Sequence, residues 1–145
     1  MDYAYFDTSA LIKRYVEELG RREVLELLRK SQCVISAVLP VEVRGALRRR
    51  VADGSLDAKR VPTILKRFAA DRPYWTVIDV SSEVLAVAEA LSAAHLMPAL
   101  DSIHVASAKL VGDRIGFWDF SFISADAHQT KVAETLGLKT RHVAS

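Results

Sequence analysis

The sequence has a single cysteine, Cys33, and no long hydrophobic run. One cysteine cannot form a disulfide within the chain, and its place in the apolar stretch CVISAV predicts a small buried side chain rather than a reactive thiol. Asp2 and Asp7 interrupt the N-terminus where a secretory signal needs an apolar core, and no stretch approaches the ~18 apolar residues of a membrane span. We therefore expect a cytoplasmic protein without a membrane segment.

The sequence also lacks a large excess of charge of one sign. Its 20 Lys and Arg residues oppose 18 Asp and Glu residues, which gives a net charge of +2. That balance is too small to predict a nucleic-acid partner by itself. Basic residues do gather between Arg44 and Arg67. Such a run is usually a solvated helix face, although it could also carry phosphate contacts.

The length of 145 residues is typical of one domain, which we take as residues 1–145. Short apolar runs alternate with helical patterns along it. Strands are predicted at residues 3–6, 33–36, 75–80, 120–124 and 139–145. Helices are predicted at residues 9–18, 21–30, 38–51, 58–71, 81–95, 101–111 and 127–137. This alternation predicts an α/β fold with a central parallel sheet of four to five strands and helices on both faces.

Four acids stand close to the predicted strand ends. Asp7 ends the first strand, Glu42 lies in the first turns of the helix after the second strand, Asp101 opens a helix, and Asp126 follows the fourth strand. The carboxyl ends of parallel strands form one ligand-binding edge, so the four side chains could converge on one cleft. Crowded carboxylates repel one another, and Mg²⁺ or Mn²⁺ would relieve the repulsion. The pattern favours metal-assisted hydrolysis of a phosphodiester.

Each acid also has a plain structural interpretation. Asp is a favoured N-cap, so Asp7, Asp101 and Asp126 could simply cap helices. Glu42 could be an ordinary surface glutamate. A non-catalytic α/β binding module would need nothing more. A phosphoaspartyl phosphatase fits poorly, because DTSAL lacks a second Asp two residues after the first.

Four blocks in order carry a family resemblance: YFDTSALIKRY, VISAVLPVEVRGAL, ALDSIHVASA and FISADAHQTKVAETLGL. The chain resembles the PIN domain over essentially its whole length, and most closely the VapC-type toxins of toxin–antitoxin pairs. The resemblance implies a Mg²⁺- or Mn²⁺-dependent endoribonuclease that hydrolyses RNA with a metal-activated water. It also implies a homodimer held inactive by a cognate VapB-like antitoxin. A PIN-type nuclease for RNA maturation or DNA, outside any toxin pair, is the alternative.

The resemblance assigns an acidic quartet that holds the metal: Asp7, Glu42, Asp101 and Asp126. Asp119 is an alternative to Asp126, because GFWDFSFISAD is longer and more aromatic than the family pattern before the last acid. Ser9 matches a hydroxyl that supports the first Asp or a metal-bound water, and it could equally bond within its own helical turn.

Two further side chains have open interpretations. Arg44 could contact a substrate phosphate or an acid of the antitoxin, although a surface arginine is the plainer interpretation. His104 lies one helical turn after Asp101. Its imidazole could bind a softer metal, but Mg²⁺ prefers oxygen, so a packed or surface histidine is expected.

Overall fold

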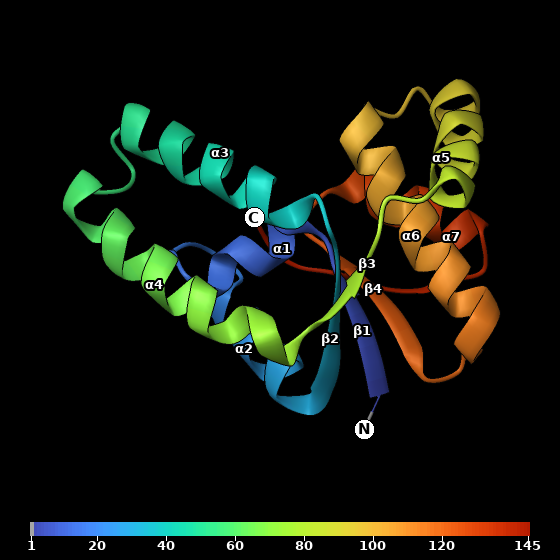
Figure 1. Ribbon diagram of the computed structural model, residues 1–145, viewed down its shortest axis with the longest axis horizontal. Coiled ribbons are helices and arrows are strands. Elements are labelled where there is room, and N and C mark those ends of the chain that lie inside the picture. Colours follow the sequence, from blue (N-terminus) through green and yellow to red (C-terminus); the bar gives the residue numbers. More distant parts are fainter. Residues whose placement is uncertain (1) are drawn as a thin grey trace.

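The computed structural model describes residues 2–145, which contain a five-stranded, entirely parallel sheet (Figure 1). Its strands are β1 (Asp2–Phe6), β2 (Ser31–Ser36), β3 (Thr76–Ile78), β4 (Phe120–Ser124) and β5 (Lys139–His142). They lie in the order β3-β2-β1-β4-β5, so β1 is central. The predicted α/β fold with a parallel sheet of four to five strands is confirmed.

Seven α-helices connect and follow these strands within residues 2–145. They are α1 (Thr8–Leu11), α2 (Arg21–Lys30), α3 (Leu39–Ala52), α4 (Val61–Asp71), α5 (Ser82–His95), α6 (Ala99–Ile115) and α7 (Ala127–Thr135). In the part of the chain that the structure describes, no helix has the length and apolar character needed to cross a membrane.

The two faces of the sheet bury separate hydrophobic clusters. Successive side chains of a strand point to opposite faces, so Ala4 and Phe6 of β1 join one cluster and Tyr5 joins the other. Figure 1 shows α1 to α4 on one side of the sheet and α5 to α7 on the other. Because both faces are covered, the three inner strands β1, β2 and β4 each end in a run of three or more buried residues. Cys33 is buried in the first cluster, as predicted.

The strand order reverses direction between β1 and β4. From β1 the chain proceeds outward to β2 and β3, and it then crosses back to β4 and β5 on the other side. In open parallel sheets such a switch point leaves a crevice at the carboxyl ends of the two strands. Asp7 directly follows β1 and Asp126 follows β4, so the topology places both acids beside this crevice.

The helix predicted over residues 9–18 is wrong. The chain forms α1 (Thr8–Leu11) and a 3₁₀ turn (Ile12–Arg14), and it leaves the helical path at Tyr15. Tyr15 and Val16 are both buried, as are most residues just before them. An α-helix turns successive side chains by about 100°, so it cannot bury a long run of neighbours against one core. Burial of this run favours the irregular path.

Gly20 is the N-cap of α2. Its φ of 91° lies in the left-handed region that L side chains rarely adopt. A Cβ at this position would collide with the carbonyl oxygen of Ala144 and would lie 2.7 Å from Cγ1 of Val143. Glycine is needed here both for its conformation and for the close approach of the C-terminal segment.

Two other predicted boundaries shift for identifiable reasons. The strand predicted at 75–80 is only Thr76–Ile78, because β2 ends at Ser36, opposite Ile78, and leaves no backbone partner beyond it. The helix predicted to open at Asp101 begins two residues earlier, at Ala99, after the N-cap Pro98.

Leu96 carries backbone strain at the C-terminal end of α5. It has left-handed dihedrals (φ 51°, ψ 38°) and is 92% exposed. That conformation costs a non-glycine L-residue about 1–2 kcal/mol, but Asn tolerates it. We therefore expect Leu96→Asn to raise the free energy of unfolding by about 0.5–1 kcal/mol, measured by urea denaturation.

Leu85→Asn is the matched control, because Leu85 is exposed on the same helix with ordinary helical dihedrals. Its replacement should leave stability unchanged or lower it, since Asn is a poorer helix former. Equal losses in both variants would show that Leu96 stores no strain.

Candidate active site

A cleft of about 430 Å³ opens at the carboxyl edge of the sheet. Residues from α1, α3 and α6 line it together with the segment that follows β4. All four predicted acids and the predicted supporting hydroxyl border this cleft: Asp7, Glu42, Asp101, Asp126 and Ser9. The structure thus brings into one place side chains that are far apart in the sequence.

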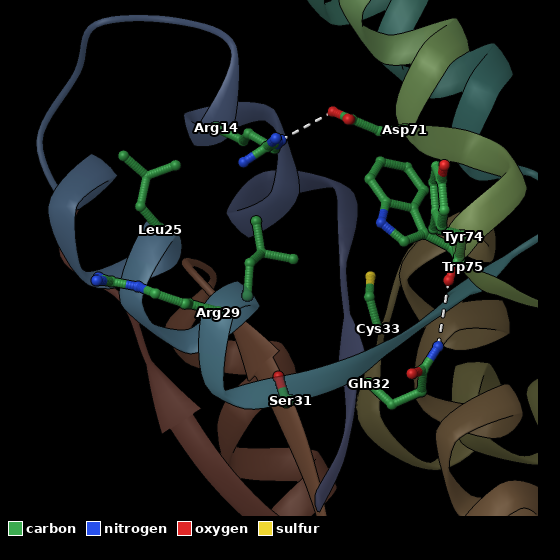
Figure 2. A pocket seen from close by; sticks show the side chains of 10 residues that line it. Arg14, Leu25, Arg29, Ser31, Gln32, Cys33, Asp71, Tyr74 and Trp75 are labelled. Atoms are coloured by element: carbon green, nitrogen blue, oxygen red, sulfur yellow. Dashed lines mark hydrogen bonds and ion pairs between the residues drawn. The ribbon is translucent and has the colours of Figure 1, made fainter. Parts of the chain in front are cut away.

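A larger cavity, of about 650 Å³, lies elsewhere, between α2, the start of β2 and the end of α4 (Figure 2). Its lining includes Asp71, whose Oδ2 accepts hydrogen bonds from Arg14 Nε at 2.9 Å and from the Tyr15 hydroxyl at 2.6 Å. Burial raises the pKa of the Cys33 thiol, which lies on its wall and is thereby less reactive. Because the carboxylate is already paired, this cavity is the weaker candidate for chemistry.

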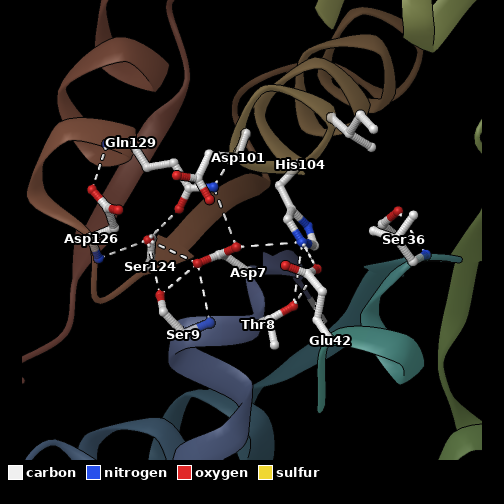
Figure 3. Close-up of polar contacts among 12 residues, drawn as sticks. Asp7, Thr8, Ser9, Ser36, Glu42, Asp101, His104, Ser124, Asp126 and Gln129 are labelled. Carbon is white, nitrogen blue, oxygen red and sulfur yellow. Dashed lines mark hydrogen bonds and ion pairs between the residues drawn. The ribbon is translucent and has the colours of Figure 1, made fainter. Parts of the chain in front are cut away.

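Asp7 lies at the centre of the acidic cleft and is 4% exposed (Figure 3). Its Oδ2 accepts hydrogen bonds from the Ser9 hydroxyl at 2.5 Å and from the Ser9 backbone N–H at 3.2 Å. The Ser124 hydroxyl oxygen lies 3.3 Å from the same oxygen, and Gln129 Nε2 donates a hydrogen bond to Oδ1 at 3.3 Å. Asp7 is therefore the N-cap of α1 and, at the same time, a carboxylate fixed toward the cleft.

Glu42 reaches the cleft from the first turn of α3. Its Oε1 accepts hydrogen bonds from His104 Nε2 at 2.5 Å and from the Thr8 hydroxyl at 2.9 Å. The same His104 nitrogen lies 3.6 Å from Asp7 Oδ1. The interpretation of Glu42 as an ordinary surface glutamate is wrong, because its side chain is only 18% exposed and is held by buried partners.

His104 is fully buried, so the expectation of a packed histidine is confirmed. Burial alone would lower the pKa of its imidazole, because the charged form loses hydration. The hydrogen bond with Glu42 and the charges of Asp7 and Asp101 outweigh burial, and the pKa of His104 is raised.

Asp101 is not the helix cap that its position suggested, since α6 begins at Ala99 and Asp101 lies in its first turn. Burial raises the pKa of its carboxyl to about 6, and the negative charges of Asp7 and Asp126 contribute in the same direction. The repulsion expected among the acids is thus visible at this residue.

Asp126 caps α7 by accepting a hydrogen bond from the backbone N–H of Gln129 at 3.0 Å, and it also borders the cleft. Asp119 stands before β4, and its carbonyl oxygen accepts a hydrogen bond from the Tyr3 N–H at 2.9 Å. A residue that precedes a strand lies at the amino edge of a parallel sheet, opposite the cleft. The alternative of Asp119 as the fourth acid is therefore wrong.

Three buried polar side chains orient the acids but were not predicted from the sequence: Thr8, Ser124 and Gln129. The Ser124 hydroxyl donates to Gln129 Oε1 at 2.8 Å and accepts from the Asp126 N–H at 3.0 Å. A signal for Gln129 is present, because Gln three residues after an N-cap Asp has the spacing of a capping box. Here its amide turns toward Asp7 instead of back toward the cap.

The arginines of α3 divide between two sides of the helix. Arg44 does not reach the acids and borders a separate groove between α3 and α4, whereas Arg49 and Arg50 line the acidic cleft. Arg50 donates to both carboxylate oxygens of Glu18, each at 3.1 Å, so its charge is compensated. The Arg49 guanidinium has no hydrogen bond or ion pair to any residue in the range 2–145.

The Arg49 side chain lies back along α3 over Gly45. A Cβ built on Gly45 would lie 3.5 Å from Arg49 Nη1, and both residues line the cleft. Helical side chains lean toward the N-terminus of their helix, which for α3 is the end that carries Glu42. An uncompensated guanidinium is therefore directed along the wall of the cleft toward the acids.

The acids that line the cleft offer only oxygen donors, which suit a hard cation. No three His, Cys, Asp or Glu side chains between residues 2 and 145 are arranged to hold a metal ion together. Mg²⁺ typically takes one or two carboxylates and completes its octahedron with water. The carboxylate oxygens lining the cleft are of the type that Mg²⁺ and Mn²⁺ prefer. A cation would neutralise the charges of Asp7 and Asp126, which add to burial in raising the pKa of Asp101.

The family model of the PIN domain matches residues 4–135, a range that contains all four acids. No curated protein sequence is a significant match to the chain.

Several solved structures share the fold over nearly their whole length. The chain is similar to FitAcB from Neisseria gonorrhoeae, with a TM-score of 0.68, 16% identity, and coverage of 94% of this chain and 95% of that one. It is similar to a chain of a toxin–antitoxin complex from Klebsiella pneumoniae, with a TM-score of 0.61, 21% identity, and coverage of 85% and 86%. It is also similar to VapBC2 from Rickettsia felis bound to a DNA fragment from its promoter. The TM-score is 0.62 and the identity 15%, and the match covers 97% of this chain and 98% of that one.

Removing the charge of Asp101 should stabilise the metal-free protein. Its carboxyl has a folded-state pKa of about 6. Because this value lies above the ordinary pKa of Asp, ionisation penalises the folded state above about pH 6, and the penalty disappears below about pH 4, where both states are protonated. We expect Asp101→Asn to raise the free energy of unfolding by about 1–2 kcal/mol near pH 7.5, with the gain fading by about pH 4.

The measurement is urea denaturation in EDTA at several pH values, followed by melting with added Mn²⁺. Mn²⁺ should raise the melting temperature of the wild type more than that of Asp101→Asn. Asp119→Asn, at the opposite edge of the sheet, is the control and should match the wild type throughout. An Asp101→Asn protein that is less stable in EDTA would contradict the repulsive cluster.

Proposed function

The chain belongs to the PIN domain family, and from this premise we propose that it is a Mg²⁺- or Mn²⁺-dependent endoribonuclease that acts as the toxin of a toxin–antitoxin pair. The observation that carries the proposal is the convergence of Asp7, Glu42, Asp101 and Asp126 on one cleft at the switch point of a parallel sheet. Capping accounts for Asp7 and Asp126, but it accounts for neither Glu42 nor Asp101.

The reaction adds water across a phosphodiester. The water oxygen bonds to phosphorus, the bond to the leaving ribose oxygen breaks, and that oxygen receives a proton. When bound, the divalent cation supplies Lewis-acid stabilisation of the charge on the phosphate and lowers the pKa of the attacking water. In this proposal Asp7 and Asp101 are the principal ligands of the cation, and Glu42 and Asp126 complete the acidic quartet that holds it.

The other polar residues of the cleft arrange these acids before any ligand arrives. Ser9 donates a hydrogen bond to Oδ2 of Asp7, Gln129 donates one to Oδ1, and Ser124 in turn holds the Gln129 amide. Such partners around a cation site fix the direction of the ligand lone pairs, and their removal typically weakens metal binding or activity about 10- to 100-fold. We assign the role of supporting Asp7 to Ser9.

The proposed partners are RNA, a cognate VapB-like antitoxin and a second copy of the chain in a homodimer, in the cytoplasm. The fold is shared with chains of a toxin–antitoxin complex from Klebsiella pneumoniae and of VapBC2 from Rickettsia felis, which supports an antitoxin as partner. A PIN-type nuclease for RNA maturation or DNA would share the same cleft. Relief of growth arrest by a co-expressed neighbouring gene would favour the toxin over this alternative.

The function is tested by incubating the purified protein with total cellular RNA, with Mn²⁺ or with EDTA, and mapping the ends of the products. We expect cleavage only with the divalent cation, and a loss of at least about 100-fold in Asp7→Asn and Asp101→Asn, because each removes a charge that the cation needs. Asp119→Asn should retain the wild-type rate. Metal-independent cleavage, or an Asp7→Asn variant as active as the wild type, would refute the assignment.

Arg49 is expected to contact the substrate phosphates, because it is the cleft arginine without a protein partner. In the inactive Asp7→Asn background, Arg49→Gln should weaken binding of a single-stranded RNA. It should also reduce the slope of log K against log salt by about 0.7 between about 50 and 200 mM. Fluorescence anisotropy of labelled RNA provides the measurement.

Arg48→Gln is the matched control, since Arg48 is the adjacent exposed arginine and borders the groove between α3 and α4 instead. It should leave both the affinity and the slope close to those of the parent. Equal effects of the two substitutions would mean that the charge of α3 acts only as a whole, without a specific contact at Arg49.

A further inference from the structure

The buried His104 connects the core of the sheet to the acidic cleft. Its Nε2 lies 2.5 Å from Oε1 of Glu42 (Figure 3). Its Nδ1 lies 2.8 Å from the hydroxyl of Tyr5. Tyr5 is fully buried in the central strand β1 and stacks on Phe122 of β4, with ring centroids 5.7 Å apart. Contacts thus connect Tyr5 in the sheet, through His104, to the carboxylate of Glu42 in the cleft.

The hydrogen bond from His104 to Glu42 does not depend on whether the imidazole is charged. An ionised carboxylate can only accept, so Nε2 must donate to Glu42. In the neutral ring the Tyr5 hydroxyl donates to Nδ1, which leaves the proton on Nε2. In the charged ring both nitrogens carry protons, and the Tyr5 oxygen accepts from Nδ1. Both states hold Glu42 in the same way.

Neither nitrogen of His104 is free to bind a cation, because Tyr5 occupies one and Glu42 the other. The interpretation of His104 as a ligand of a softer metal is therefore not supported. Within residues 2–145, Glu42 Oε1 is engaged by His104 and Thr8, whereas Oε2 has no hydrogen-bond partner. The carboxylate is thus held at one oxygen and available at the other.

We propose that His104 is a positioning residue, which fixes Glu42 by one oxygen so that the other serves the cation and substrate of the cleft. This inference rests on the proposed metal-dependent function. A glutamate side chain has three rotatable torsions and samples several rotamers when nothing holds it. Held by His104 and Thr8, the Glu42 carboxylate stays in one position. Hydrogen-bond partners orient cation-binding carboxylates in the same way in other proteins.

The test compares Mn²⁺ affinity by isothermal titration calorimetry in the full chain. His104→Leu keeps a similar apolar bulk but removes the donor, and it should weaken Mn²⁺ binding about 10- to 100-fold. His104→Gln is the conservative variant, because its amide can still donate to Glu42, and it should recover most of the lost affinity. RNA binding in EDTA should be unchanged in both variants, since His104 is not expected to touch RNA.

A double-mutant cycle separates positioning from general packing. In a Glu42→Ala background, His104→Leu should cause no further loss of Mn²⁺ affinity, because its effect passes through Glu42. If His104→Leu does not fold, Tyr5→Phe removes only the hydroxyl that holds Nδ1, and it should produce a several-fold loss that also disappears without Glu42.

Two results would overturn the inference while leaving the proposed function intact. One is Mn²⁺ affinity in His104→Leu equal to or tighter than that of the wild type, and the other is a loss of the same size with and without Glu42. A wild-type protein that neither binds Mn²⁺ nor cleaves RNA would reject the proposed function itself, and the role of His104 with it.

Discussion

The cleft brings four carboxylates together, and the polar contacts around it must offset the repulsion among them. A parallel sheet gathers the ends of its strands at one edge, and this chain places acids at several of them. Burial raises the pKa of the Asp101 carboxyl to about 6, and the negative charges of Asp7 and Asp126 add to this effect. A fold selected only for stability would not accumulate such charge in a half-buried cleft, and conflicts of this kind typically mark functional sites.

Hydrogen-bond donors from both sides of the sheet counter that repulsion. Ser9 follows β1 on the α1 side, while Gln129 comes from α7 and His104 from α6 on the other side. Asp7 lies between them and contacts groups from both halves of the molecule. The geometry of the cleft therefore depends on how the two halves pack together, because neither half carries the complete set of acids and donors.

The sequence predicted the structure best where a local pattern of residue types determines the secondary structure. Apolar runs predicted the strands, and the rule that parallel strands share a carboxyl edge placed Asp7 and Asp126 correctly. It predicted the structure least well where contacts with residues distant in the chain determine the backbone path or the role of a side chain. The buried run around Tyr15 broke a predicted helix. Gln129 of α7 gains its role from Asp7, which follows β1 at the other end of the chain. Along α3, local spacing could not tell which arginine faces the cleft, since packing against the sheet sets the rotation of the helix.

The sequence separation within the cleft has a consequence for biosynthesis. Gln129, near the end of the chain, donates a hydrogen bond to Asp7, near its beginning. Contacts between such remote residues form late in folding, after the intervening chain has been ordered. On the ribosome, the nascent chain cannot assemble this cleft until the segment after β4 has emerged from the exit tunnel, because chains fold as they are synthesised from the N-terminus. Partly translated chains would therefore lack a finished cleft, and any chemistry that the cleft performs would begin only when synthesis is nearly complete.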